Sequence, residues 1–471
     1  MEYGGLAVAA QRATRSEAEL AARTPADGFV GGLATVNAAR FGADAARCAV
    51  ASYDYLVMAG TQGLVGHRKK DRLFDVVRRL RVPAVLFAEG GGGRPNDTDV
   101  PVASALDTMA FQLWAGLSGL VPRVGVASGY CFAGNAGLLG CSDVVIATEG
   151  SSIGMGGPAM IEGAGLGAVR PQDVGPAAVH ARAGSVDLVV ADDAAAVAAV
   201  RQVLSYFQGR LPAPAPAEVA DQDALRDAVP EDRKRAYDVR AVVATLADAG
   251  SVLELRRGFA PGVVTALARI GGRPVAVVAS NCAHDAGAIT SGAADKAARM
   301  LHLAETFRLP VLSLVDTPGI MVGPEAEATG LVRHAARLFT AGARLTVPLV
   351  AVVLRKAYGL GAQAMAGGSL LAPLLTVSWP TGEFGPMGIE GAVTLALRRH
   401  LAGIEDPAER ESAFRAAVDH QYAKGRALSV AAYGEVDDVI DPAETRSRVL
   451  AVLSAAEGTP APPPRPWLDT W

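Results

Sequence analysis

Two short turns built from small residues are the places in this sequence where chemistry could occur. They run from Cys131 to Asn135 and from Tyr358 to Ala362, and each joins an apolar strand to a helical stretch. Such a turn exposes consecutive backbone N–H groups at the start of a helix, where they can hold negative charge that develops on an oxygen atom. Small residues also let a helix and a strand pack closely, so one turn alone decides little. The same turn in both halves favours two oxyanion holes, one for each of two carbonyl-type reactants.

A basic run that begins at His67 is a second candidate site. It contains Arg68, Lys69 and Lys70, which could meet the phosphates of a nucleotide-bearing substrate such as CoA. The same run is also typical of the solvated face of an amphipathic helix, and both interpretations stay open.

Other kinds of catalysis are less well supported. Cys131 stands where a nucleophile elbow would carry serine, but a structural buried thiol is the alternative, because an activating histidine is not visible from sequence. The segment Asp316–Gly319 resembles the Asp-x-x-Gly of a GTPase, yet no G-x-x-x-x-G-K-[ST] loop occurs, which disfavours phosphoryl transfer. The histidines show no metal-ligand spacing, so we expect no metal in this chain.

The helices and strands that position the two turns form a pattern that is repeated in the sequence. A helical stretch leads through Pro83 into an apolar strand and a glycine run, and the same pattern recurs 227 residues later at Pro310. A second helix then runs to Val121-Pro122 in one copy and Val347-Pro348 in the other. Apolar strands that alternate with helices predict βαβ units with a mostly parallel sheet.

This repeat divides the chain into two α/β domains. We expect an N-terminal domain at residues 1–208, a linker at 209–240, and a C-terminal domain at 241–457. The linker is predicted from its Pro, Ala and charged residues, and the Pro-rich stretch 458–471 is predicted to be a tail.

The composition excludes several classes of protein. The chain has 471 residues, of which 50% are hydrophobic and 20% charged, and its net charge of -4 argues against nucleic-acid binding. The four cysteines are unpaired in spacing, and neither a signal peptide nor a membrane span is apparent, so we expect a cytoplasmic protein. The mean hydropathy of +0.25 is high, and a homo-oligomer would bury the excess apolar surface.

Several long motifs resemble those of the carboxyltransferase (β) subunits of biotin-dependent acyl-CoA carboxylases, and of the carboxyltransferase part of long-chain acyl-CoA carboxylases. The resemblance covers about residues 26–455. Its motifs, in order, are SYDYLVMAGTQGLVGHRKKDR from Ser52, AEGGGGRP from Ala88, SGYCFAGNAGLLGCSDVVIAT from Ser128, GMGGPAMIEG from Gly154, NCAHDAGAITSGAADKAARM from Asn281, VDTPGIMVG from Val315 and RKAYGLGAQAMAGG from Arg355.

The resemblance implies a crotonase-like (ClpP-like) βαβ superhelix in each half. An acyl-CoA would bind to the N-terminal half of one subunit and biotin to the C-terminal half of a neighbour, within a dimer-built hexamer. The backbone amides that hold the two oxyanions in this family fall on Ala133 and Gly134, and on Leu360 and Gly361 with Gly359 adjacent.

The resemblance also implies the reaction. Carboxybiotin releases carbon dioxide, its ureido nitrogen takes the α-proton of the thioester, and the enolate attacks the carbon dioxide, so no side-chain base is needed. The substrate-binding residues would be Arg68, Lys69 and Lys70, with Gly156 and Gly157 of the fourth motif. The family position associated with acyl-chain choice falls on Gln363, where propionyl-type enzymes often carry Asp.

The chain departs from the family at Ala133, where Gly is usual, and at Leu360, where a small residue is usual. It has no ATP-grasp region and no Met-Lys-Met biotinylation site, so a biotin carboxylase and a biotin carboxyl carrier subunit would be its partners. One alternative is a biotin-independent enzyme of the same fold, a decarboxylase, acyltransferase or hydrolase of CoA or carrier-protein thioesters. Another is a non-catalytic assembly subunit.

Overall fold

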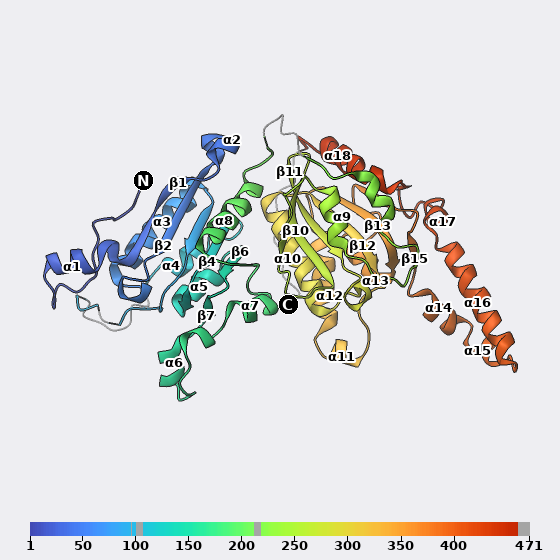
Figure 1. Cartoon of the computed structure of the whole chain (residues 1–471), viewed down its shortest axis with the longest axis horizontal. Coiled ribbons are helices and arrows are strands. Elements are labelled where there is room, and N and C mark those ends of the chain that lie inside the picture. Colours follow the sequence, from blue (N-terminus) through green and yellow to red (C-terminus); the bar gives the residue numbers. More distant parts are fainter. Residues whose placement is uncertain (96, 100–106, 212–217, 460–471) are drawn as a thin grey trace. The chain divides into compact units, whose positions relative to one another are not determined.

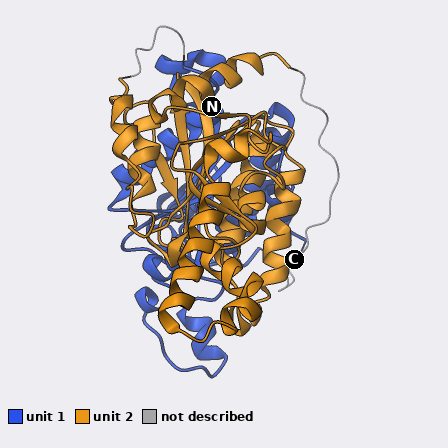
Figure 2. Ribbon diagram, turned by 90° about the vertical axis from the view of Figure 1, so that its right-hand side faces the viewer, with its two compact units in different colours: residues 1–212 blue, residues 213–471 orange. Residues whose placement is uncertain are grey.

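The computed structural model describes residues 1–95, 97–99, 107–211 and 218–459 (Figure 1). The chain divides into two compact units, Met1–Pro212 and Ala213–Trp471, which we call unit 1 and unit 2 (Figure 2). Each unit contains its own β-sheet with helices packed against it, so the prediction of an α/β chain with two sheet-containing halves is confirmed.

Unit 1 is built on a six-stranded sheet of order β1-β2-β3-β4-β6-β8. Only β1 and β2 pair antiparallel, and every other neighbour pair is parallel, as the βαβ pattern predicts. Its strands are β1 (Phe29–Thr35), β2 (Arg47–Tyr53), β3 (Ala84–Phe87), β4 (Arg123–Ala127), β5 (Tyr130–Phe132), β6 (Val144–Thr148), β7 (Ser152–Gly154) and β8 (Leu188–Val190). Its helices are α1 (Glu17–Arg23), α2 (Ala38–Ala45), α3 (Leu64–Leu80), α4 (Ala110–Ala115), α5 (Gly134–Gly140), α6 (Pro158–Gly163), α7 (Ala177–Ala183) and α8 (Asp193–Phe207).

Unit 2 carries a larger sheet of order β16-β14-β13-β12-β11-β10-β9, and β15 pairs with β13. Its strands are β9 (Leu253–Leu255), β10 (Val263–Ile270), β11 (Arg273–Ser280), β12 (Val311–Thr317), β13 (Leu349–Tyr358), β14 (Leu375–Ser378), β15 (Glu383–Gly385) and β16 (Asp438–Val439). Its helices are α9 (Val239–Leu246), α10 (Ser291–Phe307), α11 (Pro324–Glu327), α12 (Leu331–Ala343), α13 (Gly359–Met365), α14 (Ile389–Ala396), α15 (Arg398–Ala402), α16 (Pro407–Lys424), α17 (Ala427–Ala431) and α18 (Thr445–Ala455).

The sequence repeat is also a structural repeat. Helices α3 and α10 have 17 residues each, and they end at Arg81 and Arg308, both left-handed with φ near 51° and 59°. A proline two residues later prevents either helix from continuing and starts the apolar strand, β3 or β12. The loop that follows each strand pairs with the segment before the helix in the same way in both units. The backbone N–H of Gln62 donates to the carbonyl of Gly92 at 2.7 Å, and the backbone N–H of Ile289 donates to the carbonyl of Gly319 at 3.0 Å.

The segment expected to be a linker contributes to unit 2. Leu225 and Val229, within residues 209–240, are buried in the hydrophobic core of that unit together with Val242 and Val243 of α9. These apolar side chains stabilise unit 2, because burial removes them from water. Of the predicted tail, all but residues 458 and 459 lie outside the described residues.

Within the described residues, no helix combines the length and the apolar character needed to cross a bilayer. The same residues contain no group of three or more His, Cys, Asp or Glu side chains placed to hold a metal ion.

Candidate active site

The first small-residue turn lies between β5 and α5. Phe132 ends β5 and pairs with Gly154 of β7, and Ala133 follows with φ 50° and ψ −121°, a conformation that is uncommon for a residue with a side chain. The N–H of Ala133 donates to the carbonyl of Gly154 at 2.9 Å, so this amide already has a partner. The N–H of Gly134 is therefore the first donor of the turn that the helix leaves without an intrahelical acceptor.

The second turn lies between β13 and α13 and has the same construction. Tyr358 pairs with Gly385 of β15, as Phe132 pairs with Gly154, and Gly359 follows with φ 54°. This strand register aligns Gly359 with Ala133, and Leu360 with Gly134. The side chain of Leu360 is 60% exposed, so a residue larger than glycine is accommodated without closing the turn.

Each turn is held against the loop that follows the neighbouring strand. In unit 2 a Cβ on Gly361 would lie 2.6 Å from the Cα of Gly319, so only glycine permits this close approach. In unit 1 the aligned residue is Asn135, which is fully buried and accepts the N–H of Gly92 on Oδ1 at 3.1 Å. The two units therefore fix the same loop in different ways, one by backbone packing and one by a side chain.

The predicted basic site separates into surface and interior residues. Arg68 is exposed, whereas Lys69 and Lys70 are buried. The Nζ of Lys69 donates to the carbonyls of Ala26, at 2.6 Å, and Phe29. The Nζ of Lys70 donates to Oε1 of Gln62 at 2.5 Å. Since both ammonium groups have hydrogen-bond partners inside unit 1, neither is available to a phosphate in this structure, and the prediction of a phosphate contact is corrected for Lys69 and Lys70.

Gly156 and Gly157 lie between β7 and α6, close to the first turn. A Cβ on Gly157 would lie 3.2 Å from the ring of Phe132, the last residue of β5. Gly157 therefore borders the turn.

A cavity of about 490 Å³ in unit 1 offers cations that the sequence motifs did not indicate. Arg15, Arg23 and Arg94 line it. The guanidinium of Arg94 is buried and ion-paired with Asp27, but neither Arg15 nor Arg23 makes an ion pair within the described residues. Two arginines at the mouth of a cavity form a suitable site for phosphate groups. The sequence resemblance began at residue 26, so it gave no signal for them.

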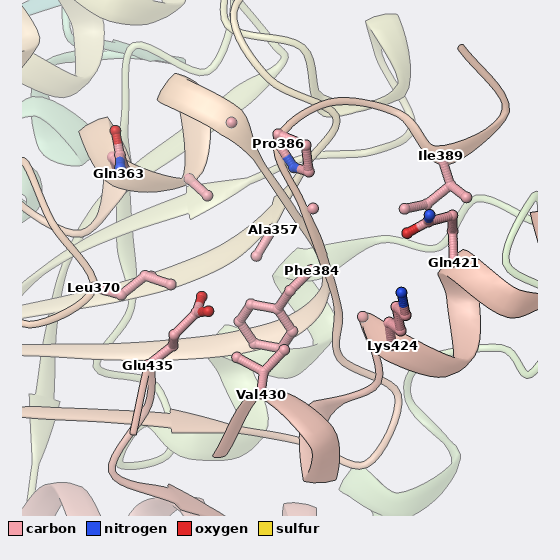
Figure 3. A pocket seen from close by; sticks show the side chains of 14 residues that line it. Ala357, Gln363, Leu370, Phe384, Pro386, Ile389, Gln421, Lys424, Val430 and Glu435 are labelled. Carbon is pink, nitrogen blue, oxygen red and sulfur yellow. The ribbon is translucent and has the colours of Figure 1, made fainter. Parts of the chain in front are cut away.

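A cavity of about 400 Å³ in unit 2 opens beside the second turn (Figure 3). Gly359 and Gln363 of α13 line it, so the structure brings the predicted specificity residue next to the predicted amide turn. Gln421 and Lys424, which project from α16 in Figure 3, provide polar groups on another wall. The remaining wall is mostly apolar and includes Ala357, Leu370, Phe384, Pro386, Ile389 and Val430, with the carboxylate of Glu435.

The buried thiol of Cys131 does not support nucleophilic catalysis. It is fully buried, and its Sγ lies 3.0 Å from the carbonyl oxygen of Ala88. Burial raises the pKa of Cys131 well above its ordinary value, so the thiolate is disfavoured. Burial also lowers the pKa of His67 to about 3, which makes this histidine neutral at physiological pH.

Comparison with known proteins shows the family to which this chain belongs. The family model for the carboxyl transferase domain matches residues 7–467. The 12S subunit of methylmalonyl-CoA carboxyltransferase from Propionibacterium freudenreichii subsp. shermanii is 34% identical over 437 residues, which cover 91% of this chain and 81% of that protein.

Solved structures of similar proteins superpose closely. A single-chain, multi-domain long-chain acyl-CoA carboxylase matches with a TM-score of 0.90 and 55% identity over 96% of this chain, which spans only 44% of that carboxylase. The transcarboxylase 12S hexamer, with methylmalonyl-CoA and methylmalonic acid bound, matches with a TM-score of 0.85 and 30% identity over 99% of this chain and 88% of its own.

This chain therefore belongs to the carboxyl transferase domain family. Within that family it is an enzyme of the acyl-CoA carboxylase carboxyltransferase type, as its resemblance to β subunits indicated.

Proposed function

We propose that this chain transfers a carboxyl group from carboxybiotin to the α-carbon of an acyl-CoA, and that each unit is a crotonase-like domain. The repeated turn carries this proposal. In both units a short pair of parallel strands ends at the turn, and the next residue, Ala133 or Gly359, has a positive φ. The residue after it, Gly134 or Leu360, lies at the start of a helix and carries the N–H that we assign as the donor. Two such donors suit a reaction in which two different oxygens gain negative charge.

Unit 1 is the proposed CoA side. The N–H of Gly134 would hold the thioester oxygen as the α-proton leaves and the enolate forms. The cavity at Arg15 and Arg23 would take the phosphates of CoA, a role that the buried Lys69 and Lys70 cannot fill. We assign no side chain of this protein as the base. The raised pKa of Cys131 disfavours its thiolate, and the lowered pKa of His67 makes its imidazole a weak base.

Unit 2 is the proposed biotin side, and its residues fit such a group. The ureido oxygen of biotin needs N–H donors, which the start of α13 supplies, and its ring needs an apolar wall, which the 400 Å³ cavity supplies. Glycines line this cavity where a side chain would not fit, since a Cβ on Gly359 would lie 2.6 Å from the carbonyl of Pro386. Carboxybiotin, when bound, supplies the carboxyl group and a ureido nitrogen that can accept the α-proton.

The relatives support the proposed acyl group, partners and assembly. Gln363 lines the unit 2 cavity, and the matched structure at 55% identity is a long-chain enzyme, so we assign an acyl chain longer than propionyl. A biotin carboxylase and a biotin carboxyl carrier are the proposed partners in the cytoplasm. A homo-oligomer is proposed because the 12S relative is a hexamer.

The experiment is a carboxyl-transfer assay with carboxybiotin and saturated acyl-CoAs from acetyl-CoA to palmitoyl-CoA. We expect carboxylation of a long-chain acyl-CoA, and we expect the Arg15→Ala/Arg23→Ala variant to raise the KM for that acyl-CoA roughly tenfold, because two charge-assisted phosphate contacts are lost. Turnover of acyl-CoA without biotin, or no turnover at all, would contradict the proposed reaction.

A further inference from the structure

Three buried polar side chains form one continuous chain of hydrogen bonds behind the first turn. Lys70 donates from Nζ to Oε1 of Gln62 at 2.5 Å, and Gln62 donates from Nε2 to Oδ1 of Asn135 at 3.0 Å. The same Oδ1 accepts the N–H of Gly92, and Nδ2 of Asn135 donates to the carbonyl of Glu89 at 2.8 Å. The chain therefore links helix α3 to both the glycine loop and the first turn.

Unit 2 shows that the fold does not require this network. The residues aligned with Lys70, Gln62 and Asn135 are Ala297, Ile289 and Gly361. Unit 2 nevertheless builds the same turn against the same loop, with Gly361 packed directly on Gly319. The aligned residues differ at all three positions, so the network is a property of unit 1.

A neighbouring lysine provides an internal comparison. Lys69 has a counterpart in unit 2, Lys296, which is also buried and donates from Nζ to the carbonyl of Phe259 at 2.8 Å. Both of these lysines tie their helix to the segment that precedes the first long strand of the sheet. Lysine at that position is thus part of the repeated scaffold, whereas Lys70 is not.

Lys70 also carries an energetic penalty that scaffolding alone does not explain. Its side chain is fully buried, and burial lowers its pKa to about 7. The charged groups nearby are Asp71, Asp27 and Arg94, and the ring of Tyr53 lies 5.4 Å from its Nζ. An alanine would avoid the desolvation, as the aligned Ala297 does in unit 2.

We infer that Lys70 is a positioning residue for the oxyanion turn of unit 1, acting through Gln62 and Asn135. The network holds the loop at Gly92 against the turn, so that the N–H of Gly134 keeps one direction while the thioester oxygen gains charge. This inference rests on the proposed function of unit 1 as the CoA side. In unit 2 the backbone of Gly361 packs directly on Gly319, so no side-chain network is needed between the turn and the loop.

The test measures steady-state carboxyl transfer from carboxybiotin to palmitoyl-CoA, and to propionyl-CoA, by wild type and three variants. In Lys70→Met, Gln62→Glu and the double variant Lys70→Met/Gln62→Glu, we expect kcat to fall on the order of 10- to 100-fold while the KM for acyl-CoA changes less than about threefold. Gln62→Glu keeps an acceptor for Lys70 but removes the donor to Asn135, so it interrupts the network with little change in volume. The double variant should be no slower than the slower single variant, because one interrupted network is already lost.

Lys296→Met is the matched control. It removes an equally buried lysine that is outside the network, so it should lower Tm without lowering the kcat of the folded protein. Normal kcat in folded Gln62→Glu, or multiplicative losses in the double variant, would overturn the inference even if Lys70→Met failed to fold. An inactive wild type would instead contradict the proposed function, which separates the two failures.

Discussion

At the scale of the residue, the site depends on which backbone N–H groups are left without a partner. Ala133 and Gly359 take positive φ and set the direction of each turn, while Gly134 and Leu360 carry the aligned donors. A side chain at the donor position is tolerated in unit 2, where Leu360 points outward. In the proposed mechanism, the chemistry therefore depends on the amide rather than on the side chain.

This makes a comparison of two substitutions at Gly134 informative. Gly134→Pro removes the N–H, and proline is well accepted at the first residue of a helix. Gly134→Ala introduces the same Cβ, which would lie 3.1 Å from Gln62 and Phe111 in either variant, but it keeps the N–H. We expect kcat for carboxyl transfer to fall about 10²- to 10³-fold in the proline variant and much less in the alanine variant.

Steady-state kinetics of Gly134→Pro and Gly134→Ala distinguishes loss of the N–H from crowding by the added side chain. Equal losses in the two would show that crowding, and not the amide, controls the rate. Circular dichroism of both variants serves as the control for folding.

The sequence predicted the turns, but both interpretations of the basic run left Lys69 and Lys70 accessible, whereas the structure buries them. Lys70 precedes Leu73, Phe74 and Val77 at helical spacing, so it lies on the apolar stripe of α3 rather than on the solvated face. That spacing was visible in the sequence. The pairing of the Ala133 amide with Gly154 was not visible, because it depends on strands β5 and β7 meeting across 21 residues.

At the scale of the element, a buried ion pair shapes the strand that precedes the unit 2 loop. Asp316 interrupts the register between β12 and β13, accepts the N–H of Lys356 at 3.1 Å, and pairs with Arg355 at 3.0 Å. Both members of the pair are almost completely buried. The pair thus fixes the end of β12 three residues before Gly319, where the second turn packs.

Removal of one partner should therefore destabilise unit 2. We expect Arg355→Met to lower the free energy of unfolding by about 3 kcal/mol, because the buried carboxylate of Asp316 would lose its closest cation and keep only Lys356, whose Nζ lies 3.6 Å away. Chemical denaturation followed by fluorescence measures this change.

The control for this prediction is Arg415→Ala on α16. It removes an ion pair with Glu411 at the protein surface, where such pairs contribute little. A similarly small effect of Arg355→Met would mean that the pair does not hold the strand end.

The order of the elements was predictable in outline. Apolar periodicity predicted parallel strands, each preceded by a helix that ends near a proline. Both features are present. The short strand β5 was not distinguished, since three residues give too short a pattern to recognise.

At the scale of the whole molecule, the two units share the same turn and loop but hold the loop in place by different contacts. Unit 1 holds its loop by Lys70, Gln62 and Asn135, and unit 2 holds its loop by a contact between two glycines. The sequence repeat predicted the duplication, because register is kept over long segments. The divergence required the side-chain contacts, which lie between residues far apart in sequence.

Mixed assembly of two inactive variants tests most directly the proposed reaction together with the arrangement that the family resemblance implies, in which each catalytic centre combines a turn from unit 1 of one copy with a turn from unit 2 of another. Gly134→Pro and Leu360→Pro would be co-expressed with different affinity tags, and oligomers that carry both tags isolated and assayed with carboxybiotin and palmitoyl-CoA. We expect each variant alone to be inactive and the mixed oligomers to regain about a quarter of wild-type activity, since one site in four would combine two intact turns. Mixed oligomers as inactive as either parent would contradict the proposal.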